Sequence, residues 1–257
     1  MREFLDILSK GGLGVNFATL VGHSTVRRAI VGEKIRDLTK NEMEVMSATL
    51  ARALEEGGFG LSTGLGYVHG RRTPHSEIKP LAKIVKDMGG VYATHLRKSG
   101  EEVGESVDET IKIAEETGVK TLISHFMPLL VSEKEYIKVF EKIESLPKNL
   151  DFNFDVYPFD TSVLTLYSLL PEWAQNGNLE VMVSNIKDSW LYRKIEKDLP
   201  SLKPDNLVVA QAPGNEIFVG KSLRDLSAIY GLRDYKSALL RLMLVTELKC
   251  MVFYKNI

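Results

Sequence analysis

The sequence predicts an α/β protein built on a parallel sheet, and two regularities support this. Over residues 14–157, short apolar runs, most of which open with Gly, alternate with stretches whose apolar residues have helical spacing. Strands of a parallel sheet are buried on both faces, so they appear as continuous apolar runs joined by right-handed helical crossovers. Five such repeats suit either a barrel or an open, doubly wound sheet, and their periodicity does not choose between these.

The expected strands and helices follow from this alternation. The five strand runs are GVNFATLVG (14–22), GFGLST (58–63), GGVYATH (89–95), GVKTLISH (118–125) and DFNFDVY (151–157). Helices are expected over 41–56, 101–117 and 133–145. Thr39 with Glu42, and Ser132 with Glu135, have the spacing of capping boxes at two of the helix starts. The glycine-rich segment 58–70 lacks the spacing of a nucleotide-binding loop, so we interpret it as a strand-to-helix connection.

After Tyr157 this rhythm ends. We expect an inserted subdomain over 160–215, one or two helices over 221–246, and a new strand in the final run MVFYKNI (251–257).

Composition narrows the class of protein. The chain has 257 residues, 44% of them hydrophobic and 26% charged, which is enough to bury a sizeable core. Its 33 Lys and Arg residues balance 34 Asp and Glu residues, which argues against a nucleic-acid-binding protein. No run is long and apolar enough for a membrane span, and the amino-terminal residues do not resemble a secretory signal. Because Cys250 is the single cysteine, no disulfide can form within the chain, and we expect a cytoplasmic location.

Two histidines stand out by their position. His95 closes the third expected strand and His125 closes the fourth, and the carboxyl ends of parallel strands form the active face of such sheets. Neighbouring strands lie about 4.8 Å apart, so the two imidazoles can converge on one Zn²⁺ ion. Zinc would act as a Lewis acid and lower the pKa of a bound water toward about 7. The alternative is that both histidines have structural roles at the rim of the sheet. Their spacing alone does not decide between zinc binding and a structural role.

Five segments of the chain form an ordered series: VNFATLVGHSTVR (15–27), GGFGLSTGLGY (57–67), YATHLRKSGEEVGESVDETIKIAEETGVKTLISH (92–125), DVYPFDTSVLTLYSLLPEW (155–173) and FVGKSLRDLSAIYG (218–231). Together they resemble the N-acyl-D-amino-acid deacylase (D-aminoacylase) branch of the amidohydrolase superfamily. The resemblance implies one partial domain over 1–257, an incomplete TIM-like (β/α)₈ barrel whose five runs are strands three to seven. It also implies zinc bound by His95 and His125, and a substrate carboxylate contacted by Tyr157.

The chain departs from the family pattern in ways that matter for activity. The family's HxH pair on strand one, its Cys ligand on strand two and its catalytic Asp on strand eight have no counterpart here, so the catalytic residue is unknown. Met127 stands where the family commonly has a carboxylate-binding Lys. We therefore expect this chain to be inactive alone, with zinc weakly bound or absent.

Other polar residues are weaker candidates. Arg97 is assigned to the substrate carboxylate, with a salt bridge to a nearby Glu as an equal alternative. His23 is expected to be structural, and Asp155 is either a rim carboxylate or a group that orients a ligand histidine. His69 and His75 are expected to be solvated, and Cys250 to be an inert core residue.

Three functions remain open at this point. The first is zinc-dependent hydrolysis of N-acyl-D-amino acids or related N-acyl compounds. The second replaces that substrate with a cyclic amide, as in dihydroorotase-like relatives, because of Met127. The third is a non-catalytic fragment or split-enzyme subunit that pairs with a complementing chain, or with itself, through open barrel edges. An unrelated α/β binding protein or aldolase-like barrel is disfavoured by the ordered family segments.

Overall fold

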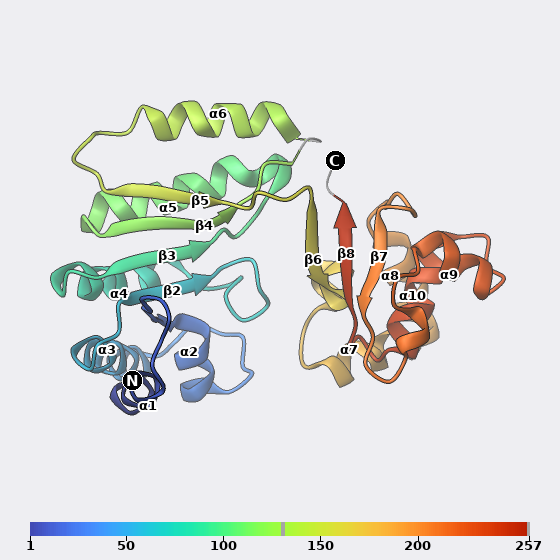
Figure 1. Ribbon diagram of the computed structural model, residues 1–257, viewed down its shortest axis with the longest axis horizontal. Coiled ribbons are helices and arrows are strands. Elements are labelled where there is room, and N and C mark those ends of the chain that lie inside the picture. Colours follow the sequence, from blue (N-terminus) through green and yellow to red (C-terminus); the bar gives the residue numbers. More distant parts are fainter. Residues whose placement is uncertain (130–131, 256–257) are drawn as a thin grey trace. The chain divides into compact units, whose positions relative to one another are not determined.

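The computed structural model describes residues 1–129 and 132–255, and these divide into two compact units (Figure 1). Unit 1 is Met1–Tyr157 and unit 2 is Pro158–Ile257. The boundary falls at the residue where the strand–helix rhythm of the sequence ends. The single partial domain over 1–257 and the insertion over 160–215 stay predictions.

Unit 1 contains the parallel sheet that the sequence predicts. Its strands are β1 (Leu20–Gly22), β2 (Gly60–Gly64), β3 (Val91–His95), β4 (Lys120–Phe126) and β5 (Phe152–Val156). They pair in chain order, every pair is parallel, and β1 and β5 are the edges of this sheet within the described residues. The first expected run is the least accurate prediction, because only its last three residues form a strand. The earlier part of the run forms no strand in the described part of the chain, and its apolar side chains, such as Val15 and Phe17, are exposed.

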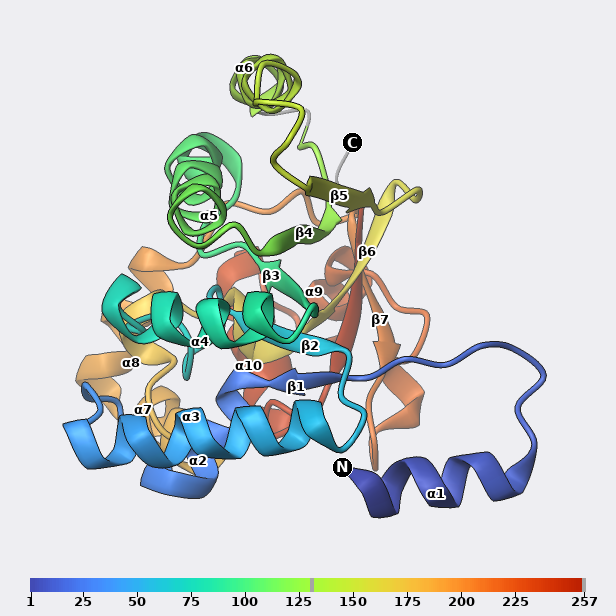
Figure 2. The same cartoon turned by 90° about the vertical axis from the view of Figure 1, so that its left-hand side faces the viewer.

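The helices of unit 1 lie between these strands in the chain, except for the first, which precedes β1 and has no buried residue. They are α1 (Arg2–Gly11), α2 (His23–Val31), α3 (Lys40–Glu55), α4 (His75–Asp87), α5 (Val103–Thr117) and α6 (Glu133–Glu144), with a short 3₁₀ turn, η1 (Gly100–Glu102). Figure 2 shows α3, α4, α5 and α6 following the curve of the strands on the same side. The contacts between sheet and helices form two apolar clusters, one around Leu61 and Tyr92 and one around Ile123 and Phe126.

The helix ends test the capping predictions. Thr39 and Glu42 form the expected capping box at the start of α3, in which each side chain accepts from the other's backbone N–H. The second predicted box is wrong, because the Ser132 side chain makes no capping hydrogen bond at the start of α6. Ser132 is instead almost fully buried, whereas Glu135 pairs with Lys138. Gly118 ends α5 in the left-handed conformation at φ 68°, as a glycine at this position commonly does.

Unit 2 is built on an antiparallel sheet. Its strands are β6 (Thr161–Thr165), β7 (Leu207–Gln211) and β8 (Met251–Lys255), with β8 in the centre. Its helices are α7 (Leu179–Lys187), α8 (Ser189–Asp198), α9 (Leu223–Ile229) and α10 (Tyr235–Val245), with 3₁₀ turns η3 (Leu166–Leu169), η4 (Glu172–Ala174) and η5 (Glu216–Phe218).

The final apolar run is a strand, as expected, but it belongs to this antiparallel sheet rather than to the parallel one. The last two residues of that run, 256–257, lie outside the described residues. Residues 221–246, for which one or two helices were expected, contain two, α9 and α10, which share a core with β7 and β8. Among the helices of the described ranges, none is long and apolar enough to cross a membrane.

Candidate metal-binding site

His95 and His125 meet at the carboxyl ends of β3 and β4 in unit 1. The Nδ1 atom of His95 lies 3.1 Å from the Nε2 atom of His125, and one ring nitrogen donates a hydrogen bond to the other. The ring centroids are 4.7 Å apart. The convergence expected from the two strand positions is therefore present.

A bulge in β4 produces this convergence. The regular pairing of β3 with β4 sets Thr94 opposite Ile123, so an uninterrupted strand would point His125 to the same face as Ile123, the face that packs on the helices. Instead, the pairing with β5 shifts between Ile123 and Phe126, which inserts one extra residue in β4. His125 takes the left-handed conformation at φ 41°, which is uncommon for a residue with a side chain. Its ring consequently lies on the face of His95.

Asp155 stabilises this unusual backbone. Its Oδ1 atom accepts a hydrogen bond from the backbone N–H of His125 across the β4–β5 pair. Asp155 is exposed and contacts the backbone of His125 rather than its ring, so a role in orienting a ligand histidine stays a prediction. Strained backbone held in place by its surroundings is typical of functional sites.

The loop between β2 and α4 covers the other side of His95. The Tyr67 ring stacks on the His95 ring with centroids 4.5 Å apart and planes 22° apart. Gly66 comes so close that a Cβ atom there would lie 2.8 Å from the Nε2 atom of His95. Only glycine allows this approach, so His95 is held between the loop and His125.

Burial of His95 affects its charge. Desolvation, together with the nearby charge of His125 when protonated, lowers the pKa of His95 to about 4. His95 is therefore neutral near pH 7, which is the form of imidazole that binds metal ions.

The geometry of the two rings fits two ligands of one zinc ion. Two nitrogen atoms bound to a tetrahedral zinc at 2.0–2.1 Å lie about 3.3 Å apart. The observed nitrogen separation of 3.1 Å is close to this value. In residues 1–129 and 132–255, however, no group of three or more His, Cys, Asp or Glu side chains could hold a metal ion. The pair alone therefore falls short of the three protein ligands that catalytic zinc usually has, and zinc binding by His95 and His125 stays a prediction.

Arg97, two residues beyond His95, is engaged in internal contacts. Its guanidinium group forms a two-point ion pair with Glu109 of α5, with distances of 2.9 and 2.7 Å. It also donates to the backbone carbonyl groups of Gly70, Arg71 and Thr73. This is the salt-bridge alternative for Arg97, and its contact with a substrate carboxylate stays a prediction.

Met127 and Tyr157 directly follow strands β4 and β5, respectively. The backbone N–H of Tyr157 donates to the carbonyl of Phe126 in β4 at 3.5 Å. Both side chains are partly buried and both have contacts within the protein. The role of Tyr157 in binding substrate stays a prediction.

His23 is part of a buried ionic cluster. It is fully buried, and its Nε2 atom lies 2.8 Å from Oε1 of Glu77, which also accepts from Arg27 at 2.9 Å. This agrees with the structural role expected of His23. The prediction of solvated side chains at His69 and His75 is wrong in one respect, because each pairs with a carboxylate, Glu33 and Glu116 respectively, and is only partly exposed.

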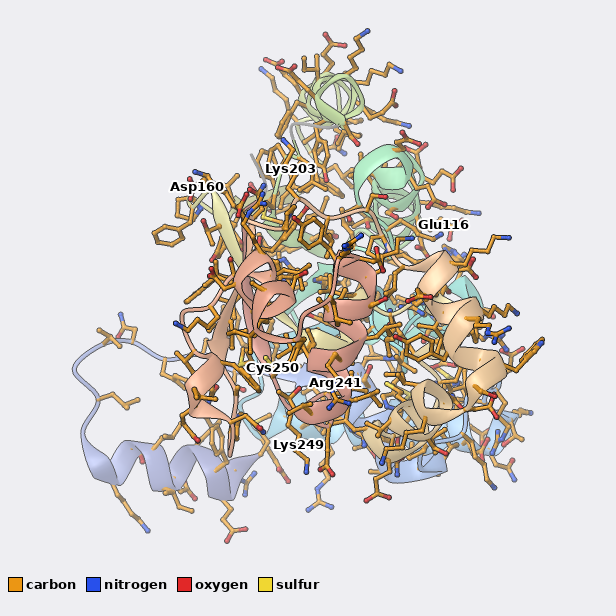
Figure 3. The ribbon with its side chains drawn as sticks, turned by 90° about the vertical axis from the view of Figure 1, so that its right-hand side faces the viewer. Glu116, Asp160, Lys203, Arg241, Lys249 and Cys250 are labelled. Carbon is orange, nitrogen blue, oxygen red and sulfur yellow. The ribbon has the colours of Figure 1, made fainter. Side chains whose placement is uncertain are left out.

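Cys250, labelled in Figure 3, belongs to the core of unit 2. It is 2% exposed, and burial raises the pKa of its thiol to about 11. Its environment is that of an inert core cysteine, as expected.

The sequence does not predict the stacking of Tyr67 on His95, which depends on the fold of the β2–α4 loop. It predicts a salt bridge from Arg97 to a nearby Glu as one alternative, but it does not identify Glu109 of α5 as the partner. The glycines around Tyr67 were the available signal, because Gly66 and Gly70 both mark close approaches of backbone.

Comparison with known proteins identifies relatives of the chain. No protein-family model matches it. A D-aminoacylase of Alcaligenes xylosoxydans xylosoxydans is 32% identical over 161 residues, which are 61% of this chain and 33% of the relative. An N-acyl-D-glutamate deacylase of the same organism is 29% identical over 178 residues, 68% of this chain and 35% of the relative.

Solved structures show the same relationship at the level of the fold. The N-acyl-D-glutamate deacylase of Bordetella bronchiseptica, complexed with zinc and a phosphonate inhibitor, has a TM-score of 0.71 and 24% identity. The match covers all of this chain and 47% of that one. A D-aminoacylase structure gives a TM-score of 0.72 at 24% identity, covering 99% of this chain and 46% of that one. The chain therefore matches part of the D-aminoacylase fold, and it spans about half the length of these proteins.

Proposed function

We propose that this chain, whose relatives are the N-acyl-D-amino-acid deacylases, provides two metal ligands of a zinc-dependent hydrolase that cleaves the amide bond of N-acyl-D-amino acids. The observation that carries the proposal is the 3.1 Å separation of the ring nitrogens of His95 and His125. Similarity to the deacylases extends over 161 residues in the D-aminoacylase comparison. One solved relative is complexed with zinc.

The barrel architecture is part of this proposal. The five parallel strands of unit 1 are strands three to seven of a (β/α)₈ barrel, and residues 160–215 are an insertion into it. The position of α3 to α6 on one side of a curved sheet supports this arrangement, since the helices of such a barrel form its outer ring (Figure 2). His95 and His125 then lie at the carboxyl-terminal rim, where these barrels have their active sites.

A zinc ion bound there would supply Lewis-acid chemistry, polarising the carbonyl group of the amide and lowering the pKa of water at the site. His95 is suited to hold it because the ring is neutral, stacked on Tyr67 and fixed beside His125. The described residues provide no third ligand group for a metal, so we propose that the chain binds zinc weakly and does not turn over substrate alone.

A complementing polypeptide is proposed to provide further metal ligands, because the described residues contain no group of three that could hold a metal ion. Strands β1 and β5 are the edges of the parallel sheet in the described part of the chain, and each can pair with a further parallel strand. The partner proposed is a chain that carries the remaining barrel strands with the other metal ligands and a proton acceptor.

The substrate class rests on two residues. Tyr157, directly after β5, is proposed to contact the substrate carboxylate. Met127 cannot donate a charged hydrogen bond, unlike the Lys common in the family, and this favours a second candidate: a cyclic amide, which has no such carboxylate at the cleaved bond.

The experiment is a deacylation assay with and without complementation. The purified chain is incubated with zinc and with the N-acetyl derivatives of D-glutamate, D-aspartate and D-leucine, their L enantiomers, and a cyclic amide. The assay is repeated with a fragment of a D-aminoacylase relative that lacks the region matched by this chain. We expect no turnover by the chain alone, and D-selective turnover in the mixture.

Two double variants make the assay specific. Turnover in the mixture should disappear with His95→Ala/His125→Ala and persist with His69→Ala/His75→Ala, which removes two histidines from other sites. Zinc-dependent turnover by the chain alone would contradict its proposed inactivity. Turnover limited to the cyclic amide would favour the second candidate, and a stable complex without any turnover would overturn the hydrolase proposal.

A further inference from the structure

The guanidinium group of Arg97 has all of its N–H donors engaged inside unit 1. Nε and Nη2 donate to the two carboxylate oxygens of Glu109, at 2.9 and 2.7 Å. Nη2 also donates to the carbonyl of Thr73 at 2.9 Å. Nη1 donates to the carbonyl of Gly70 at 3.4 Å and to that of Arg71. No N–H group is left for a ligand unless one of these contacts breaks.

The three carbonyl groups that Arg97 binds belong to the loop between β2 and α4. This loop is closed by its own hydrogen bonds: Gly70 and Arg71 both donate from their backbone N–H to the carbonyl of Tyr67, at 2.9 and 2.8 Å. At Gly70 a Cβ atom would lie 2.0 Å from the carbonyl oxygen of Gly64. The loop is therefore tightly folded, and Arg97 contacts its last residues while Tyr67 stands at its beginning.

The beginning of the same loop packs on His95. The backbone N–H of Leu65 donates to the carbonyl of His95 at 3.0 Å, and the Tyr67 ring stacks on the imidazole. A change in the loop's position would move Tyr67, and the plane of the His95 ring would lose its support on that side.

We propose that Arg97 is a positioning residue for His95. By joining α5, through Glu109, to the carbonyl groups of residues 70, 71 and 73, it holds the loop in the place where Tyr67 stacks on His95. Nδ1 of His95 consequently faces His125. This role goes beyond the proposed deacylase function and does not require a metal or substrate, because the contacts exist within the chain itself. It competes with direct binding of a substrate carboxylate by Arg97.

The chemistry of the side chain explains why arginine occupies this position. Its planar fork matches a carboxylate at two points and still has donors for carbonyl groups at its other edge. The ion pair is mostly buried, with 20% of the Arg97 and 22% of the Glu109 side chain exposed. Lysine carries the same charge but only one nitrogen, so it cannot reach Glu109 and the three carbonyl groups together.

Nuclear magnetic resonance of the histidine side chains tests this proposal. A stacked aromatic ring shifts the signals of the imidazole protons, so the His95 signals of the metal-free chain report whether Tyr67 lies over them. The variants Arg97→Lys and Arg97→Ala should lose this shift, as Tyr67→Leu does when it removes the ring altogether. Glu109→Gln should lose part of it, because the carbonyl contacts of Arg97 remain.

Lys142→Ala is the matched control. Lys142 of α6 forms an exposed ion pair with Asp108 of α5, the residue before Glu109. The control should leave the His95 signals in place. The dispersion of the other signals shows that each variant is folded, and if Arg97→Ala unfolds, Arg97→Lys and Glu109→Gln decide the result. Unchanged His95 signals in folded Arg97→Lys and Glu109→Gln would overturn the proposal.

Discussion

The Nε2 atom of His125 lies 3.1 Å from the Nδ1 atom of His95, although the regular register of their strands would point the two rings to opposite faces of the sheet. The extra residue in β4 and the positive φ of His125 bring the rings together. A bulge that redirects one side chain at the carboxyl end of a strand is a common device beside functional sites.

The contact of Asp155 with His125 gives a first prediction. Asp155→Ala removes the acceptor for the His125 backbone N–H, so it should lower the free energy of unfolding of the chain by about 1 kcal/mol. Asp155→Asn keeps an acceptor oxygen and should cost less. Urea unfolding of both variants measures the difference. Equal losses in the two variants would show that the hydrogen bond does not stabilise this backbone.

The sequence predicts the parallel sheet well because its strands are buried, and buried parallel strands form continuous apolar runs. It also places His95 and His125 at neighbouring strand ends. The expected convergence of the two rings is present, but it depends on the bulge between Ile123 and Phe126, which the sequence pattern does not show. The first strand is overestimated for a similar reason, since the apolar residues before Leu20 find no neighbouring strand within the described residues.

Long-range polar contacts were the least predictable part. Glu77 and Glu109 look like ordinary helix-surface residues in the sequence, and only the fold brings them to Arg27 and Arg97. The final apolar run shows the same limit, because its composition predicts a strand but not its antiparallel partners.

The buried cluster of His23, Arg27 and Glu77 gives a second prediction. Glu77→Gln removes the negative charge and leaves the buried Arg27 guanidinium without its ion pair, so unfolding should require about 3 kcal/mol less free energy. Glu116→Gln is the control, because Glu116 pairs with His75 and Lys79 at the surface and its loss should cost below about 1 kcal/mol. Chemical denaturation compares the two variants, and similar losses would contradict the importance of burial.

The same carboxylate predicts a pH dependence of stability. Burial alone would raise the pKa of Glu77, but hydrogen bonds from His23 and Arg27 outweigh it, so the pKa lies below the usual 4.5. A hydrogen bond from Arg36 is the largest cause that lowers the pKa of Glu42 to about 2. Both carboxylates therefore stabilise the fold above about pH 4.5, and this contribution is lost as the pH falls through their folded-state pKa values.

Denaturation at a series of pH values measures this effect. The free energy of unfolding should fall as the pH drops below about 4.5, since the unfolded chain then binds more protons than the folded one. Glu77→Gln should reduce the slope in that range. An identical slope in Glu77→Gln and the unsubstituted chain would show that the Glu77 carboxylate is not the group that titrates.

The buried thiol of Cys250 gives a fourth prediction. Because burial raises its pKa to about 11 and leaves 2% of the residue exposed, a thiol reagent should react with the folded chain very slowly near pH 8. Unfolding in denaturant should make the reaction fast and complete. Immediate reaction of the folded chain would contradict the position of Cys250 in the core of unit 2.

The zinc content of the purified chain, measured by elemental analysis after equilibration with zinc, tests the central claim most directly. We predict a measurable amount of weakly bound zinc, at most one ion per chain, that disappears in His95→Ala/His125→Ala and is unchanged in His69→Ala/His75→Ala. Zinc that remains in the first variant, or no zinc in any of the three proteins, would contradict a metal site formed by His95 and His125.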